Sequence, residues 1–161
     1  SNRDGQWEVY VLDIASGAVT NVSQSWAIDE NPAWSPDGSR IAFQSSRNSS
    51  RFEISAGPYE DGTRQGNWDI FAVNPDSTGL AGVATSWLDE VIPAWSCDGQ
   101  WIVFQFMGKE GNRDVWQALP DGSNLQRLTT DPAFDGVPVW SPPENDGRRY
   151  ADPLSFRWTW N

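Results

Sequence analysis

A motif that recurs in phase is the sequence feature that most constrains this fold. The segment Asn31–Gly38 (NPAWSPDG) returns as Ile92–Gly99 (IPAWSCDG) and, shortened, as Val137–Pro142 (VPVWSP). The tryptophans of the three copies lie 61 and then 45 residues apart. Such self-similarity indicates a repeat architecture, in which each unit buries its apolar face against its neighbour.

A second motif keeps the same register. Trp7–Tyr10 (WEVY) matches Trp68–Phe71 (WDIF) 61 residues later and Arg113–Trp116 (RDVW) a further 45 residues on. The longer first interval leaves a polar surplus at about 47–65, which we expect to be an inserted surface loop. The repeats then cover 1–143, and 144–161 forms a C-terminal extension with an edge strand.

Each unit consists of short strand-like runs bounded by turns. Residues 40–44 (RIAFQ) and 101–106 (WIVFQF) are rich in β-branched and aromatic side chains, and Pro36–Gly38 supplies a tight turn before the first run. Residues 68–73 form another run, and a weaker fourth lies near 80–83. Four short strands repeated every roughly 40–45 residues are typical of a propeller blade.

The order of these runs predicts an all-β propeller segment of about three four-stranded blades. Third and fourth strands are expected near 7–12 and 18–22, and four-strand units start at Pro32 and Pro93. The last expected strand is an innermost strand near 138–141. The segment thus has two complete units and two complementary half-blades, and residues 154–160 alternate like a displaced second strand.

Three blades are too few to close a propeller of the usual four to eight blades. Unpaired sheet edges favour association, so we expect a second copy, another protein partner or the rest of a larger parent chain to complete the propeller.

Composition excludes several functional classes. The chain has 11 Lys+Arg against 22 Asp+Glu, a formal charge of −11, which argues against nucleic acid as a partner. It has no His and a single Cys, so Ser-His-Asp catalysis, a His or Cys-cluster metal site and an internal disulfide are excluded. No apolar run reaches the roughly 18 residues needed to span a membrane. We predict no catalytic residue and no cofactor.

The motif PAWSPDG, followed by IAF and then by DIF or EVY, resembles the WD40-like (PD40) repeat of TolB-like β-propellers over about residues 5–142. The resemblance implies that the PAWS strand is innermost in each blade and that the protein is periplasmic or lies at a bacterial surface. Fold alone does not fix function. We favour a non-enzymatic interaction or scaffold module. The alternatives are the substrate-gating propeller of a prolyl-oligopeptidase-type hydrolase and a carbohydrate-binding propeller.

Most matched positions are expected to be structural. The repeat tryptophans would pack between blades rather than stack on sugars, and the Asp-Gly pairs would form turns. This structural set is Pro32, Trp34, Asp37, Gly38, Pro93, Trp95, Asp98, Gly99, Pro138 and Trp140.

Candidate functional residues lie in the loops and at the C-terminal end. Trp26 and Trp87 also match at an offset of 61, in loops that lead to innermost strands. Trp158 and Trp160 share one face of the terminal run. The partner-binding candidates are Trp26, Trp87, Asp135, Trp158 and Trp160.

An acidic column precedes the repeat prolines by three residues and consists of Asp29, Glu90 and Asp135. Carboxylates that converge near a propeller axis would supply oxygen ligands for Ca²⁺, which makes the column a weak metal candidate. The favoured interpretation is that each acid caps its own turn or meets a nearby Arg or Ser.

Overall fold

A computed structural model describes residues 1–48, 67–108 and 111–140. Most of the expected insertion at about 47–65, the extension 144–161 and the tryptophans Trp158 and Trp160 lie outside these described residues. Strands, turns and loops make up the described part of the chain.

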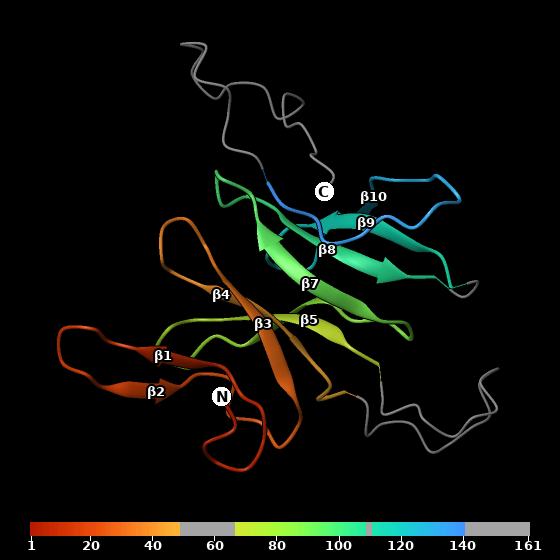
Figure 1. The fold of residues 1–161 in the computed structure, drawn as a ribbon. Helices are drawn as coiled ribbons and strands as arrows, with labels where there is room; N and C mark the ends of the chain where they lie inside the picture. The colour runs from red at the N-terminus through yellow and green to blue at the C-terminus, as the bar shows by residue number, and fades with distance from the viewer. Residues whose placement is uncertain (49–66, 109–110, 141–161) are drawn as a thin grey trace, which may run out of the picture.

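The strands form three successive antiparallel units (Figure 1). The N-terminal hairpin consists of β1 (Tyr10–Leu12) and β2 (Val19–Asn21). The first sheet has the order β3 (Asp29–Trp34), β4 (Ile41–Ser45), β5 (Asp69–Val73) and β6 (Ala81–Ala84). The second sheet runs from β7 (Glu90–Trp95) through β8 (Ile102–Met107) and β9 (Arg113–Ala118) to β10 (Gln126–Arg127).

This arrangement confirms the predicted fold class, with two four-stranded units after a two-stranded half-blade. The innermost strand expected near 138–141 is much reduced. Among its described residues only Trp140 forms an isolated bridge.

The Asp-Gly turns between the first two strands of each sheet share one geometry. Asp37 accepts a hydrogen bond from the Ser35 hydroxyl at 2.6 Å, and Asp98 accepts one from Ser96 at 2.5 Å. Hydrogen bonds, that from Ser35 first, lower the pKa of Asp37 to about 2. Gly38 has φ of 71°, a left-handed conformation that favours glycine.

A bulge interrupts each innermost strand just before its proline. Asn31, Ile92 and Val137 have φ of 51°, 58° and 55°, and the pairing register of β3 and β7 shifts at this point. A left-handed backbone is unfavourable for β-branched residues, so surrounding contacts must hold it. The Gln44 side-chain oxygen accepts from the Ile92 N–H at 3.1 Å and from the Asn31 amide at 2.8 Å. This glutamine links the bulges of the two sheets.

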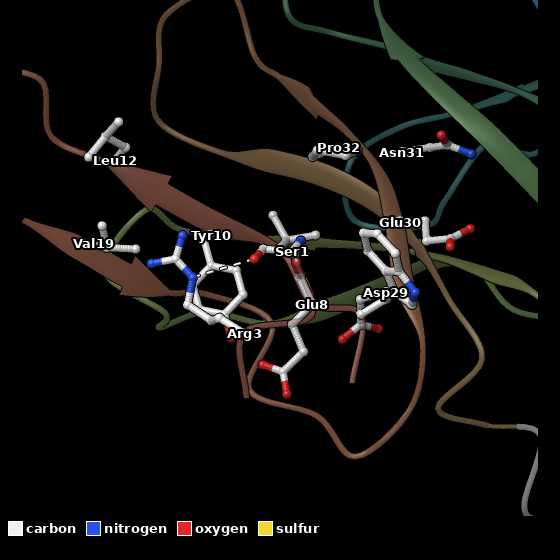
Figure 2. A pocket seen from close by; sticks show the side chains of 12 residues that line it. Ser1, Arg3, Glu8, Tyr10, Leu12, Val19, Asp29, Glu30, Asn31 and Pro32 are labelled. Atoms are coloured by element: carbon white, nitrogen blue, oxygen red, sulfur yellow. Dashed lines mark hydrogen bonds between the residues drawn. The ribbon is translucent and has the colours of Figure 1, made fainter. Parts of the chain in front are cut away.

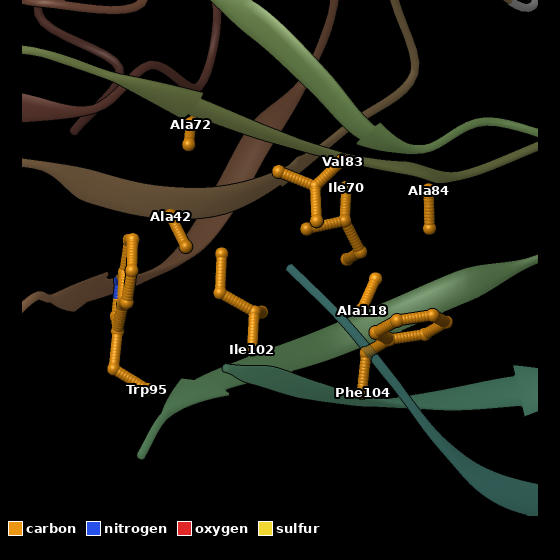
Figure 3. Close-up of a cluster of buried hydrophobic side chains, with 9 residues drawn as sticks. All are labelled: Ala42, Ile70, Ala72, Val83, Ala84, Trp95, Ile102, Phe104 and Ala118. Carbon is orange, nitrogen blue, oxygen red and sulfur yellow. The ribbon is translucent and has the colours of Figure 1, made fainter. Parts of the chain in front are cut away.

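The main core lies between the two sheets (Figure 3). Ile102 and Phe104 of β8 are fully buried, and they pack with Ala42 and Ile70 of the first sheet. Trp95 of β7 is 9% exposed, and its indole nitrogen donates to the Ala33 carbonyl at 3.0 Å. Trp95 therefore packs between blades, as expected.

The same expectation is wrong for Trp34, which is 49% exposed. The N-terminal hairpin packs on the first sheet through a second, smaller hydrophobic cluster. This cluster includes Val9, Val22, Phe43 and Phe71. Among the described residues, a four-stranded sheet precedes Trp95, whereas only the two-stranded hairpin of β1 and β2 precedes Trp34. Trp34 therefore has less of the described chain to pack against.

Candidate interaction surface

Two exposed tryptophans stand on matching turns. The Ser25 hydroxyl accepts from the Ala27 N–H at 3.0 Å, and the Ser86 hydroxyl accepts from the Leu88 N–H at 3.1 Å. The residue inside each turn is a tryptophan, and Trp26 is 64% and Trp87 74% exposed. Each turn thus presents a large apolar side chain to solvent.

Both loops are fixed at their base by the same backbone hydrogen bonds. The Asp29 N–H donates to the Trp7 carbonyl, and the Glu90 N–H donates to the Trp68 carbonyl, both at 2.7 Å. A second pair of matched backbone hydrogen bonds fixes the other side of each loop. The Ser46 N–H donates to the Ile28 carbonyl at 3.0 Å, and the Met107 N–H donates to the Asp89 carbonyl at 2.9 Å. A fixed loop loses little conformational freedom on binding, which favours affinity.

The surroundings of the two tryptophans differ. Trp87 borders an open groove of about 470 Å³ whose other lining residues are Ser86, Leu88 and Phe106. The Phe106 ring lies 5.0 Å from that of Trp116. At the position that matches Phe106, the first unit has the smaller, polar Ser45. The site at Trp87 is therefore the more apolar of the two.

The acidic column lies beside a second set of matched acids, Glu8, Asp69 and Asp114, which stand at or near the starts of the third strands. In the first unit, both oxygens of buried Asp29 lie 3.2 Å from the Arg47 guanidinium. The guanidinium also lies over the rings of Phe43 and Phe71, at 5.2 and 4.8 Å. The Arg47 side chain is only 13% exposed, so this first residue of the expected insertion belongs to the packed part of the first unit.

The second unit has no equivalent arginine, because Gly108 occupies the position that matches Arg47. Asp69 and Glu90 are 0% and 1% exposed, and Ser86 donates hydrogen bonds to both carboxyl oxygens of Glu90. Burial, followed by the Asp69 charge, raises the pKa of Glu90 to about 8. Glu90 is therefore paired with a hydroxyl and faces another acid, whereas Asp29 meets a cation.

The third acid, Asp135, is 8% exposed, and its N–H donates to the Arg113 carbonyl at 2.8 Å. Its burial does not fit the prediction of a direct partner contact. Within 1–48, 67–108 and 111–140, no three acidic or thiol side chains converge as metal ligands. Asp29, Glu90 and Asp135 therefore do not form the Ca²⁺ site considered from the sequence.

A further groove, of about 620 Å³, opens beside β1 and the start of β3 (Figure 2). Its lining residues include Arg3, Glu8, Tyr10 and Glu30. The Arg3 guanidinium lies 4.6 Å from the Tyr10 ring centroid. In the described chain β1 pairs with β2 alone, so this groove follows its open edge.

The Asp69–Glu90 pair predicts a pH-dependent stability. Glu90 binds its proton more tightly in the folded chain than at its ordinary pKa of 4.5, so stability should fall as pH rises from there toward about 8. Glu90→Gln keeps an N–H donor for Asp69 without a charge. We expect its melting temperature to exceed that of the wild-type chain by a margin that grows with pH. Thermal unfolding of both chains across this range measures the margin, and a constant difference would contradict the raised pKa of Glu90.

No family model matches the chain. It is similar to a Protein TolB homolog of Chlorobium luteolum, with 29% identity over 129 residues, 65% of this chain and 30% of that protein. The solved structure of a putative TolB from Agrobacterium tumefaciens matches with a TM-score of 0.62 and 25% identity, over 79% of this chain and 42% of the other. TolB from Acinetobacter baumannii matches with a TM-score of 0.60 and 16% identity, over 83% and 29%. The chain spans less than half the length of each of these relatives.

Proposed function

We propose that this chain, which has a TolB-like β-propeller fold, is a non-enzymatic module that binds a protein partner through Trp26 and Trp87. The observation that carries the proposal is the exposure of both side chains, 64% and 74%, on turns of matching geometry. Tryptophan is enriched among residues that dominate binding energy. Two such anchors on fixed loops suit a protein contact.

Charge pairing supports a non-enzymatic role. The sequence has no His, and the buried acids Asp29, Glu90 and Asp114 each have a charged or polar neighbour. Asp29 pairs with Arg47, Glu90 with Asp69 and Ser86, and Asp114 with Arg127 at 2.8 Å. These contacts give the carboxylates structural roles.

The resemblance to TolB proteins supports a periplasmic or bacterial surface location. No helix long and apolar enough to cross a membrane occurs in the part of the chain that the structure describes. With a formal charge of −11, the module would associate fastest with a partner whose contact surface is basic.

The proposal is tested with a Trp26→Ala/Trp87→Ala double variant. Proteins from a periplasmic extract of the source organism are captured on the wild-type chain and on the variant, and their amounts are compared by mass spectrometry. A partner identified in this way is then purified and titrated. We expect its dissociation constant to rise about 30-fold or more, because each tryptophan is a binding anchor.

Trp34→Ala is the matched control, since it removes an equally large exposed side chain from another surface. It should bind the purified partner as the wild-type chain does, and the melting temperature of the double variant should change little. Unchanged affinity of the double variant would contradict the proposal. Glycan binding that the double variant loses would instead favour a carbohydrate-binding propeller, and hydrolysis by the purified chain would contradict the non-enzymatic role.

A further inference from the structure

The last repeat carries a third loop, residues 131–135, that is built like the two tryptophan loops. Asp131 stands where those loops have serine, and its side-chain oxygen accepts from the Ala133 N–H at 2.8 Å. The Asp135 N–H donates to the Arg113 carbonyl at 2.8 Å, which is the bond that fixes the base of the other two loops. The third loop therefore belongs to the same structural series.

A further contact repeats between the second and third loops. The Asn67 amide donates to the Ser86 carbonyl at 2.6 Å, and the matching Asn112 amide donates to the Asp131 carbonyl at 3.1 Å. Matching loops of successive repeats lie on one face of a repeat protein, and that face is often the binding face. Pro132 stands at the tryptophan position, so the matched tryptophans do not reveal this loop in the sequence.

The apolar side chain that the third loop exposes is Phe134, which is 61% exposed. The Arg113 guanidinium lies 5.1 Å from the centroid of its ring. A Cβ atom at Gly136 would lie only 2.8 Å from Phe134 Cε1, so this glycine leaves the space that the ring occupies. Because the ring is exposed and yet held between these neighbours, it would lose little conformational entropy on binding.

The guanidinium beside this ring has a free donor group. With the Gln105 amide oriented so that its oxygen faces Arg113, this oxygen accepts from Nη1 at 3.0 Å and from Nε at 3.2 Å. No described residue accepts from Nη2 or forms an ion pair with Arg113, whereas Arg47 and Arg127 each pair with an aspartate. Arginine donors are well suited to a carboxylate, so Arg113 offers an acid a partner beside an apolar ring.

We propose that the third loop extends the binding surface of Trp26 and Trp87, and that Phe134 and Arg113 together bind a segment of the protein partner that is both acidic and apolar. An apolar side chain of this segment packs on the Phe134 ring, and its carboxylate pairs with Nη2 of Arg113. The inference rests on the proposed function and deepens it by naming the chemistry of the partner at one loop.

The charge of the rest of the chain makes this contact selective. With 22 Asp+Glu against 11 Lys+Arg, most of the chain repels a carboxylate. In the first unit, Arg47 is already paired with Asp29, and the second loop carries Asp89 beside Trp87. An acidic residue of the partner therefore favours the third loop over the other two, and this preference sets the register of the partner.

A random dodecapeptide library displayed on phage tests the proposal on the wild-type chain. We expect enriched peptides to combine Asp or Glu with a large apolar residue, and synthetic copies of them are titrated by fluorescence anisotropy. Phe134→Ala should raise their dissociation constant about tenfold or more, because it removes the apolar anchor. Trp34→Ala is the matched control, since it removes an exposed aromatic side chain outside the three loops, and it should bind the peptides as the wild-type chain does.

A double-mutant cycle tests the ion pair itself. Replacing the peptide carboxylate with its amide should raise the dissociation constant about tenfold for the wild-type chain but change it little for Arg113→Gln, because the pair is already lost there. Additive effects of the two changes would show that Arg113 acts only by holding Phe134 or Gln105, and would overturn the proposal. Failure to enrich acidic peptides, or peptides that bind Phe134→Ala as tightly as wild type, would also overturn it.

The Trp26→Ala/Trp87→Ala double variant separates this inference from the proposed function. Peptides that span the three loops should lose affinity for both this variant and Phe134→Ala. Peptides that depend on the tryptophans but not on Phe134 would contradict the third contact and leave the proposed function standing. Peptides that depend on Phe134 but not on the tryptophans would support the third contact and count against the proposed function.

Discussion

Replacing Arg47 with methionine is expected to lower the free energy of unfolding by about 3–5 kcal/mol, the usual cost of removing one partner of a buried ion pair. The Asp29 side chain is 0% exposed, and both of its oxygens face the guanidinium. Methionine retains much of the packing on Phe43 and Phe71 but leaves this carboxylate without its cation. The loss is therefore electrostatic in origin, and urea unfolding of both chains measures it.

The charge explanation has a specific control. In an Arg47→Met/Asp29→Asn double variant no buried charge remains, so much of the lost stability should return. An equal loss in the single and double variants would show that Arg47 acts through packing or through its hydrogen bonds to Ser45 and Ser23.

Strand order and turns could be predicted because the repeat fixes them locally. Pro36–Gly38 and the IAF run both favour the observed turn and strand, so local preference and fold agree. The bulge was not predictable in this way. A residue before proline normally avoids a helical or left-handed backbone, yet Ile92 adopts φ of 58°. The contact that helps to hold it comes from Gln44, 48 residues earlier.

The position of the candidate site could be predicted from the sequence, but only some of the contacts around it could. The matched offset located Trp26 and Trp87, whose binding role stays a prediction. Two acidic columns are visible in the sequence, but nothing in it shows that Glu90 is buried beside Asp69 while Asp29 meets Arg47. Arg47 lies at the start of an apparent insertion, which predicts a surface position for it. Its partner is set by tertiary packing, which a single sequence does not show.

Trp95→Ala and Trp34→Ala should have very different effects on stability, although the two tryptophans occupy the same motif position. Trp95 is 9% exposed and fills the contact between two sheets, so its loss should cost about 3–5 kcal/mol through lost burial and a cavity. Trp34 is 49% exposed, and we expect its loss to cost about 1 kcal/mol or less. Urea unfolding of both variants compares the two, and equal losses would mean that Trp34 is as buried in the folded chain as Trp95.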